Sequence, residues 1–307
     1  MNHRSKFSMN SWIEKIFYIF ICSIYAGSLD LFFKNNYNYG DLAFYKMIYE
    51  SSVNYKLNDL IGQYFYLDPI FYIIIWCVSN LDLSFTSFNI FTNFIFLNLG
   101  LLVIHKHYKK YRISIAFVFL LNFYTLTLCY TLLRLQIAII FTFCAVLYDK
   151  RLFKLLCYFF AISTHAITIV FLIPIFLGSR WNYMKFLALT SITFGIYYLL
   201  YDKIKFYLEF NTAGLLSVMA LGCVSFLLFK LDKVNMSNLI TFLGLGLVFG
   251  GAGRITNLFY LSLILRTPNS YFKPLGVIAF TGLSIYLVFK GGIYAWISLQ
   301  GGDYYLK

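Results

Sequence analysis

The chain has 307 residues, of which 61% are apolar, 21% aromatic and 12% charged. Soluble domains carry about 25% charged residues, so this composition excludes an ordinary soluble domain and indicates a polytopic membrane protein. The formal net charge of +13 would suggest nucleic acid in a soluble chain, but here we expect basic cytoplasmic loops and no nucleic-acid partner.

The N-terminal part predicts one span followed by a long outer loop. Residues 12–33 are apolar, and the basic residues before them place the N-terminus inside. Residues 34–82 follow as the outer loop, in which GDLAFYKMIYE and the segment 67–81 are expected to lie as interfacial helices. The second segment is shorter than the roughly 20 residues that a span needs. If 67–82 crossed the membrane instead, the basic run HKHYKKYR would lie outside, so we favour the arrangement without this crossing.

The rest of the chain predicts further spans joined by basic inner turns. The segment 153–178 is short for two spans, and we expect a tight helical hairpin with His165 near its apex. The other expected spans are 84–104, 113–131, 134–148, 186–201, 213–230, 238–251, 254–266 and 274–290. Residues 1–307 are therefore predicted to form a single all-α transmembrane domain, a polytopic integral membrane protein with about 9–11 transmembrane helices.

Two arginines depart from the positive-inside pattern. Arg134 has leucine on both sides, and Arg254 follows the glycines of GGAGR; both fall at outer ends of apolar runs. An Arg in the bilayer costs about 2.5–3.5 kcal/mol on insertion scales unless it is partnered or hydrated. Each could simply snorkel to the headgroups, but a recessed guanidinium also suits bidentate binding of a lipid phosphate or diphosphate.

Proton-transfer candidates are few. His165 is the only histidine outside the N-terminal segment and the basic run, and it is either a hydrogen-bonded helix residue or a proton carrier. No second His or Cys has ligand spacing, so we expect no metal site and no cofactor, with a divalent metal left open. Six of the twelve acidic residues lie in 30–82, and from these we choose Asp41 as the base and Asp68 as its runner-up. Both could instead be solvated loop residues.

A family resemblance rests on two segments. LRLQIA, with Arg134 and Gln136, precedes a basic turn and then the helix STHAITIVFLIP, which carries His165 and a downstream proline. This pattern resembles the EpsG family, Wzy-like polymerases of bacterial surface polysaccharide. Leu135 separates an Arg and a Gln that are adjacent in the family pattern, and Thr164 stands where Phe is usual. The segment with Arg254, and with Tyr260 six residues later, is similar to the family as well.

The resemblance implies a glycosyltransferase of the bacterial inner (cell) membrane, joining undecaprenyl-diphosphate-linked oligosaccharide repeat units at the outer face into O-antigen, capsule or exopolysaccharide. Asp41 or Asp68 would take the acceptor proton and His165 would assist. The diphosphate ligands would be Arg134, Gln136, Arg254 and Tyr260.

Membrane lipid, a flippase and a chain-length regulator would be the further partners. The order of span, long outer loop and interfacial helices is also similar to that of GT-C glycosyltransferases. A flippase for the same lipid-linked oligosaccharide and a membrane acyltransferase that modifies the glycan remain alternatives.

Overall fold

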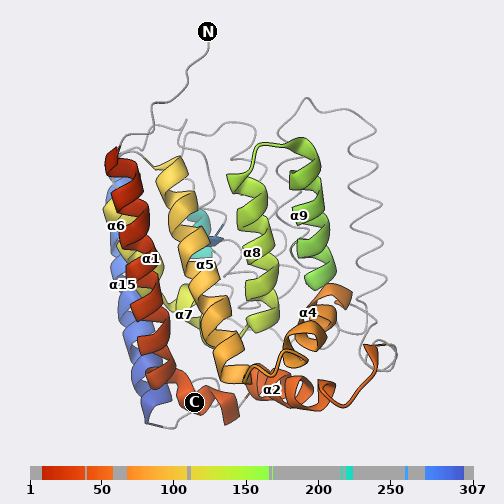
Figure 1. Ribbon diagram of the computed structural model, residues 1–307. Helices are drawn as coiled ribbons and strands as arrows, with labels where there is room; N and C mark the ends of the chain where they lie inside the picture. Colours follow the sequence, from red (N-terminus) through yellow and green to blue (C-terminus); the bar gives the residue numbers. More distant parts are fainter. Residues whose placement is uncertain are drawn as a thin grey trace.

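The computed structural model describes residues 9–38, 40–57, 68–108, 112–165, 168, 216, 219–223, 260–261 and 274–300. All regular secondary structure in these ranges is helical, as predicted, and the longer helices run roughly side by side in a bundle (Figure 1). The elements are α1 (Met9–Phe33), η1 (Lys34–Asn38), α2 (Gly40–Ser52), α4 (Pro69–Ser79), α5 (Phe85–His107), α6 (Arg112–Leu121), α7 (Phe123–Tyr130), α8 (Leu133–Leu147), α9 (Arg151–Thr164) and α15 (Pro274–Leu299).

Three helical segments of the described part are long and apolar enough to cross a membrane: Ile16–Asn38, Phe85–His107 and Phe280–Leu299. A fourth span arises if α6 and α7 are counted together. These segments make the chain an α-helical membrane protein. Helices α8 and α9 have 15 and 14 residues and are shorter. The expected spans 186–201 and 238–251 lie outside the described residues, and 213–230 and 254–266 lie largely outside them.

The predicted span 113–131 is broken at Asn122. Helices α6 and α7 meet there at an angle of 50°. The Asn122 side chain accepts from the Thr125 backbone N–H at 3.0 Å, which caps α7, and its amide donates to the Phe119 carbonyl at 2.7 Å, near the end of α6. One side chain thus replaces backbone hydrogen bonds on both sides of the break. Gly291 of α15 lets that helix approach the break, since a Cβ there would lie 2.7 Å from the Leu121 carbonyl oxygen.

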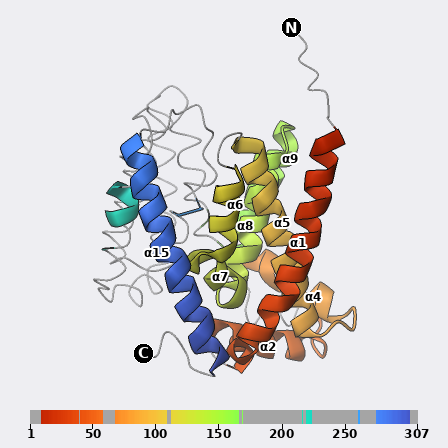
Figure 2. The same ribbon diagram turned by 90° about the vertical axis from the view of Figure 1, so that its left-hand side faces the viewer.

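Helices α2 and α4 lie together at the end of the bundle where α1 ends and α5 begins (Figures 1 and 2). Helix α4 has 11 residues, or about 17 Å at 1.5 Å per residue, which is too short to cross the hydrocarbon core. The C-terminal helix α15 reaches the same end and packs against α1, α6 and α7 (Figure 2).

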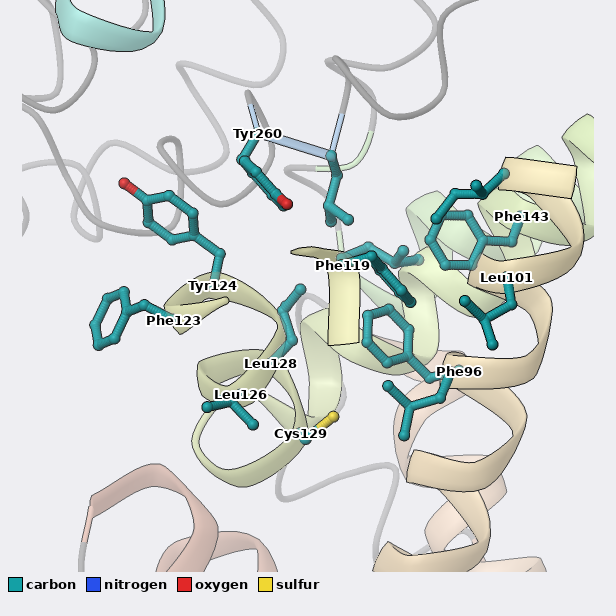
Figure 3. Packing of buried hydrophobic residues seen from close by; sticks show 14 of the residues in the cluster. Phe96, Leu101, Phe119, Phe123, Tyr124, Leu126, Leu128, Cys129, Phe143 and Tyr260 are labelled. Carbon is teal, nitrogen blue, oxygen red and sulfur yellow. The ribbon is translucent and has the colours of Figure 1, made fainter. Parts of the chain in front are cut away.

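Two apolar clusters hold these elements. The larger joins α1, α5, α6, α7, α8 and α15 and includes the stacked rings of Phe96 and Phe143, 5.6 Å apart (Figure 3). The smaller packs α2 and α4 against the first turns of α5 and α8, through residues such as Tyr45, Phe71 and Leu133. This second cluster fixes α4 beside the start of α8, which decides the geometry of the candidate site.

Candidate acid–base and anion site

Asp68 lies at the N-terminus of α4 with its side chain turned away from its own helix. It is the N-cap residue before Pro69, yet its carboxylate makes no capping hydrogen bond. The residue is only 2% exposed. A buried carboxylate needs partners, and those of Asp68 include Arg134 and His165.

Arg134 comes from the first turn of α8, 66 positions later in the chain. Its Nη1 donates to Asp68 Oδ2 at 2.5 Å, and its guanidinium carbon lies 5.7 Å from the centre of the Tyr45 ring. Asp41 and Tyr72 are also within electrostatic reach of the guanidinium. The buried Nε of Arg134 has no hydrogen-bond partner within the described part of the chain.

His165 enters the site from the end of α9. It is the C-cap residue in an extended conformation, with φ −157° and ψ 107°, so the chain leaves the helix there. Its Nδ1 lies 3.7 Å from Asp68 Oδ1, a contact rather than a short hydrogen bond. Helix α9 packs on both α8 and α4, which sets the distance between the imidazole and the carboxylate.

The three side chains, which we call the Asp68 cluster, are recessed but accessible. The Arg134 and His165 side chains are 15% and 14% exposed, against 3% for Asp68. Helices α4 and α8 both begin at this cluster, so their positive dipole ends lie beside it. The N-cap residue of α8 is Leu132, whose side chain cannot accept hydrogen bonds from the N–H groups of the first turn. The surroundings of Asp68 therefore favour negative charge.

Helix α2 is anchored over this region by tyrosines. Tyr49 donates to the Leu83 carbonyl at 2.8 Å, and burial raises the pKa of its hydroxyl. Tyr45, four residues before it, lies against both the Arg134 guanidinium and the Phe71 ring. The sequence offers one signal for such residues: Tyr45 and Tyr72 each follow an acidic residue by four positions, which places each pair on one face of a helix.

The predicted site residues separate into three groups. Asp68, Arg134 and His165 come together, with Asp41 nearby in the first turn of α2. Arg254 lies outside the described residues. The remaining two, Gln136 and Tyr260, are elsewhere.

Gln136 and Tyr260 are both buried away from the Asp68 cluster. Residue 136 lies about 200° around α8 from residue 134, at about 100° per residue. The Gln136 amide accordingly points into the bundle, where it donates to Asn93 Oδ1 at 2.7 Å. Tyr260 is 1% exposed and packs 5.4 Å from the Tyr124 ring in the larger apolar cluster (Figure 3). Neither position supports direct contact with a ligand held by Arg134.

No group of three or more His, Cys, Asp or Glu side chains in the described ranges is arranged to hold a metal ion. The Asp68 cluster can instead hold an anion at Arg134 and exchange a proton at His165.

Comparison with known proteins found no matching family model, no similar curated protein and no similar solved structure.

Proposed function

We propose that this membrane protein is a glycosyltransferase that joins polyprenyl-diphosphate-linked oligosaccharide repeat units into a bacterial surface polysaccharide. The observation that carries the proposal is the Asp68 cluster: one buried carboxylate shared by a guanidinium and an imidazole at one end of the helix bundle. Glycosyl transfer from a diphosphate requires a group that binds the leaving anion and a group that accepts the acceptor's proton. The cluster contains both.

Arg134 is the anion-binding group. In the reaction, an acceptor hydroxyl oxygen forms a bond to the anomeric carbon while the bond from that carbon to the diphosphate oxygen breaks. Negative charge grows on the departing diphosphate, and a guanidinium held in a fixed position stabilises it. Arg134 uses Nη1 for Asp68, and its Nε is unpartnered among the described residues. The positive end of α8 adds to the same field.

His165 is the proton acceptor in this scheme, in place of the carboxylates expected from the sequence. Arg134 favours the ionised form of Asp68 and occupies one of its oxygens. The other oxygen faces His165 Nδ1 and would keep a proton on that nitrogen. Nε2 would then take the proton from the acceptor hydroxyl, with Asp68 positioning the ring.

An outer-face location is supported by the distribution of charge. The basic residues at the C-terminal end of α5 and the N-terminal end of α9 lie at the opposite end of the bundle from α2 and α4 (Figure 1). Lys106 there donates to the last carbonyls of α8. The positive-inside rule assigns that end to the cytoplasm and the Asp68 cluster to the exterior.

The proposal is tested by matched arginine variants in cells that make the polysaccharide. Arg134→Lys should abolish chain lengthening, because an ammonium cannot reproduce the planar fork. Arg151→Lys, an exposed change at the opposite end, is the control and should leave the polymer length unchanged. Purified protein in lipid nanodiscs should bind undecaprenyl diphosphate less tightly with Arg134→Lys than with Arg151→Lys.

Three other outcomes would refute the proposal. Full-length polymer made by Arg134→Lys would exclude the leaving-group role. Full-length polymer that lacks only an acyl substituent would identify an acyltransferase, for which the His165–Asp68 pair is also suited. Repeat units trapped on the inner leaflet would identify a flippase.

A further inference from the structure

Gln136 belongs to a second polar site, inside the bundle. Together with Asn89 and Asn93 of α5 it forms what we call the amide cluster, whose three members are all 0% exposed. Gln136 Nε2 donates to Asn93 Oδ1 at 2.7 Å, and Asn89 Nδ2 donates to the Tyr37 hydroxyl at 3.0 Å. Asn89 and Asn93 are four residues apart, so they lie on one face of α5.

Each amide keeps one buried polar atom with no hydrogen-bond partner among the described residues. These atoms are Asn89 Oδ1, Asn93 Nδ2 and Gln136 Oε1. Unpartnered buried polar atoms are rare, because burial removes the hydrogen bond to water without replacing it. Three on the packed helices α5 and α8, beside the Tyr130 side chain with which Asn93 also interacts, therefore point to a missing ligand.

The chemistry of the three atoms defines that ligand. They comprise two acceptors and one donor, a set that water can satisfy, because a water molecule both donates and accepts hydrogen bonds. Reversing both the Asn93 and Gln136 amides again leaves two acceptors and one donor. A metal cation fits poorly, because one N–H group faces the site in either arrangement.

A polar path leads from the amide cluster toward the end of α1. Asn89 donates to Tyr37, and Tyr37 donates to Asp30 at 2.5 Å. Asp30 is half-buried rather than enclosed. A chain of hydrogen-bonded side chains therefore connects the amide cluster to the half-buried Asp30.

We propose that the amide cluster is an internal water-binding site between α5 and α8, within the candidate span Phe85–His107. Gln136 thus binds water at the interface between α5 and α8 and does not bind substrate. The site is separate from the Asp68 cluster, and the inference does not rest on the proposed glycosyltransferase function.

X-ray hydroxyl-radical footprinting of the full chain in nanodiscs tests the proposal, because radicals formed from bound water modify adjacent buried side chains. The reporter is Cys129, which is 0% exposed and has Sγ 3.6 Å from Gln136 Nε2. Exposed Cys77 is the positive control, and buried Cys157 is the negative one. We expect Cys129 to be oxidised at a rate close to that of Cys77 and well above that of Cys157.

The double variant Asn89→Leu, Gln136→Met removes both acceptors and should lose the Cys129 modification while Cys77 is modified as before. If this variant does not fold, the test is the ratio of the Cys129 oxidation rate to the Cys157 oxidation rate in the unaltered protein. A Cys129 rate as slow as that of Cys157, or modification retained in the folded double variant, would overturn the proposal. Thermal stability that rises with sodium or potassium but not with choline would mark a cation site and would also overturn it.

Discussion

Replacing Asp68 by Asn removes the negative charge beside Arg134 while keeping the size of the side chain. The guanidinium then stays in a site where its side chain is only 15% exposed, without its anionic partner. Removing one member of a buried ion pair costs about 3–5 kcal/mol, because the other charge stays buried and unpaired. The partial exposure of Arg134 lets water replace part of the lost contact, so we expect a loss of about 3 kcal/mol in the free energy of unfolding.

A double-mutant cycle separates this pair from general damage to the site. Arg134→Gln alone should also be destabilising, because Asp68 would then be the unpaired buried charge. The variant carrying both changes should lose far less stability than the sum of the two single losses, with a coupling of about 2–3 kcal/mol. The measurement is urea unfolding in mixed micelles, followed by circular dichroism and tryptophan fluorescence.

A second ion pair provides the control. Lys46 and Glu50 lie 3.9 Å apart on the surface of α2, with side chains 37% and 61% exposed. Exposed pairs of this spacing contribute about 0.3–0.5 kcal/mol, so Glu50→Gln should be nearly neutral. The reasoning fails if Asp68→Asn is as mild as Glu50→Gln, or if the costs of Asp68→Asn and Arg134→Gln simply add.

Three further changes probe the packing around the site, each by the same unfolding measurement. Gly291→Ala should destabilise by about 1–3 kcal/mol, because the added Cβ meets the α6 backbone. Gly282→Ala has open space within α15 and should stabilise by about 0.5–1 kcal/mol, because alanine favours a helix more than glycine does. Equal effects of the two changes would contradict the close approach of α15. Asn122→Ala should cost about 1 kcal/mol through the lost cap of α7, and an unchanged stability would show that the break does not depend on this side chain. Tyr45→Phe should keep most of the ring's contact with Arg134, whereas Tyr45→Leu should lower the free energy of unfolding by about 0.5–2 kcal/mol more. Equal losses in the two variants would show that the aromatic ring does not stabilise Arg134.

The Asp68 cluster also explains why an Arg is tolerated at the start of an apolar helix. Leu133 is fully buried in the smaller apolar cluster, so the first turn of α8 is packed against α2 and α4. Arg134 is the next residue in the chain and therefore lies at the same interface. Its desolvation is offset by Asp68, by the Tyr45 ring and by Asp41 in electrostatic reach.

The amino-acid sequence alone determined the membrane class, the all-α fold and the small set of residues able to do chemistry. Composition decides the first two, because a chain with 12% charged residues cannot cover a soluble surface, and only helices satisfy the backbone of such apolar runs within a single segment. The same physical reasoning singled out Arg134, since a charge among leucines requires a partner.

Only the tertiary structure decided which partner that is. Asp41 and Asp68 were both available from the same loop, and the packing of α4 against α9, which itself packs on α8, selects Asp68 for Arg134 and His165. The position of Gln136 around α8 directs its side chain into the bundle. Asn122 breaks the apolar segment 113–131, which the sequence predicts as one span. Local patterns specify the apolar face of each helix, whereas a contact between residues 66 positions apart depends on how several helices pack at once.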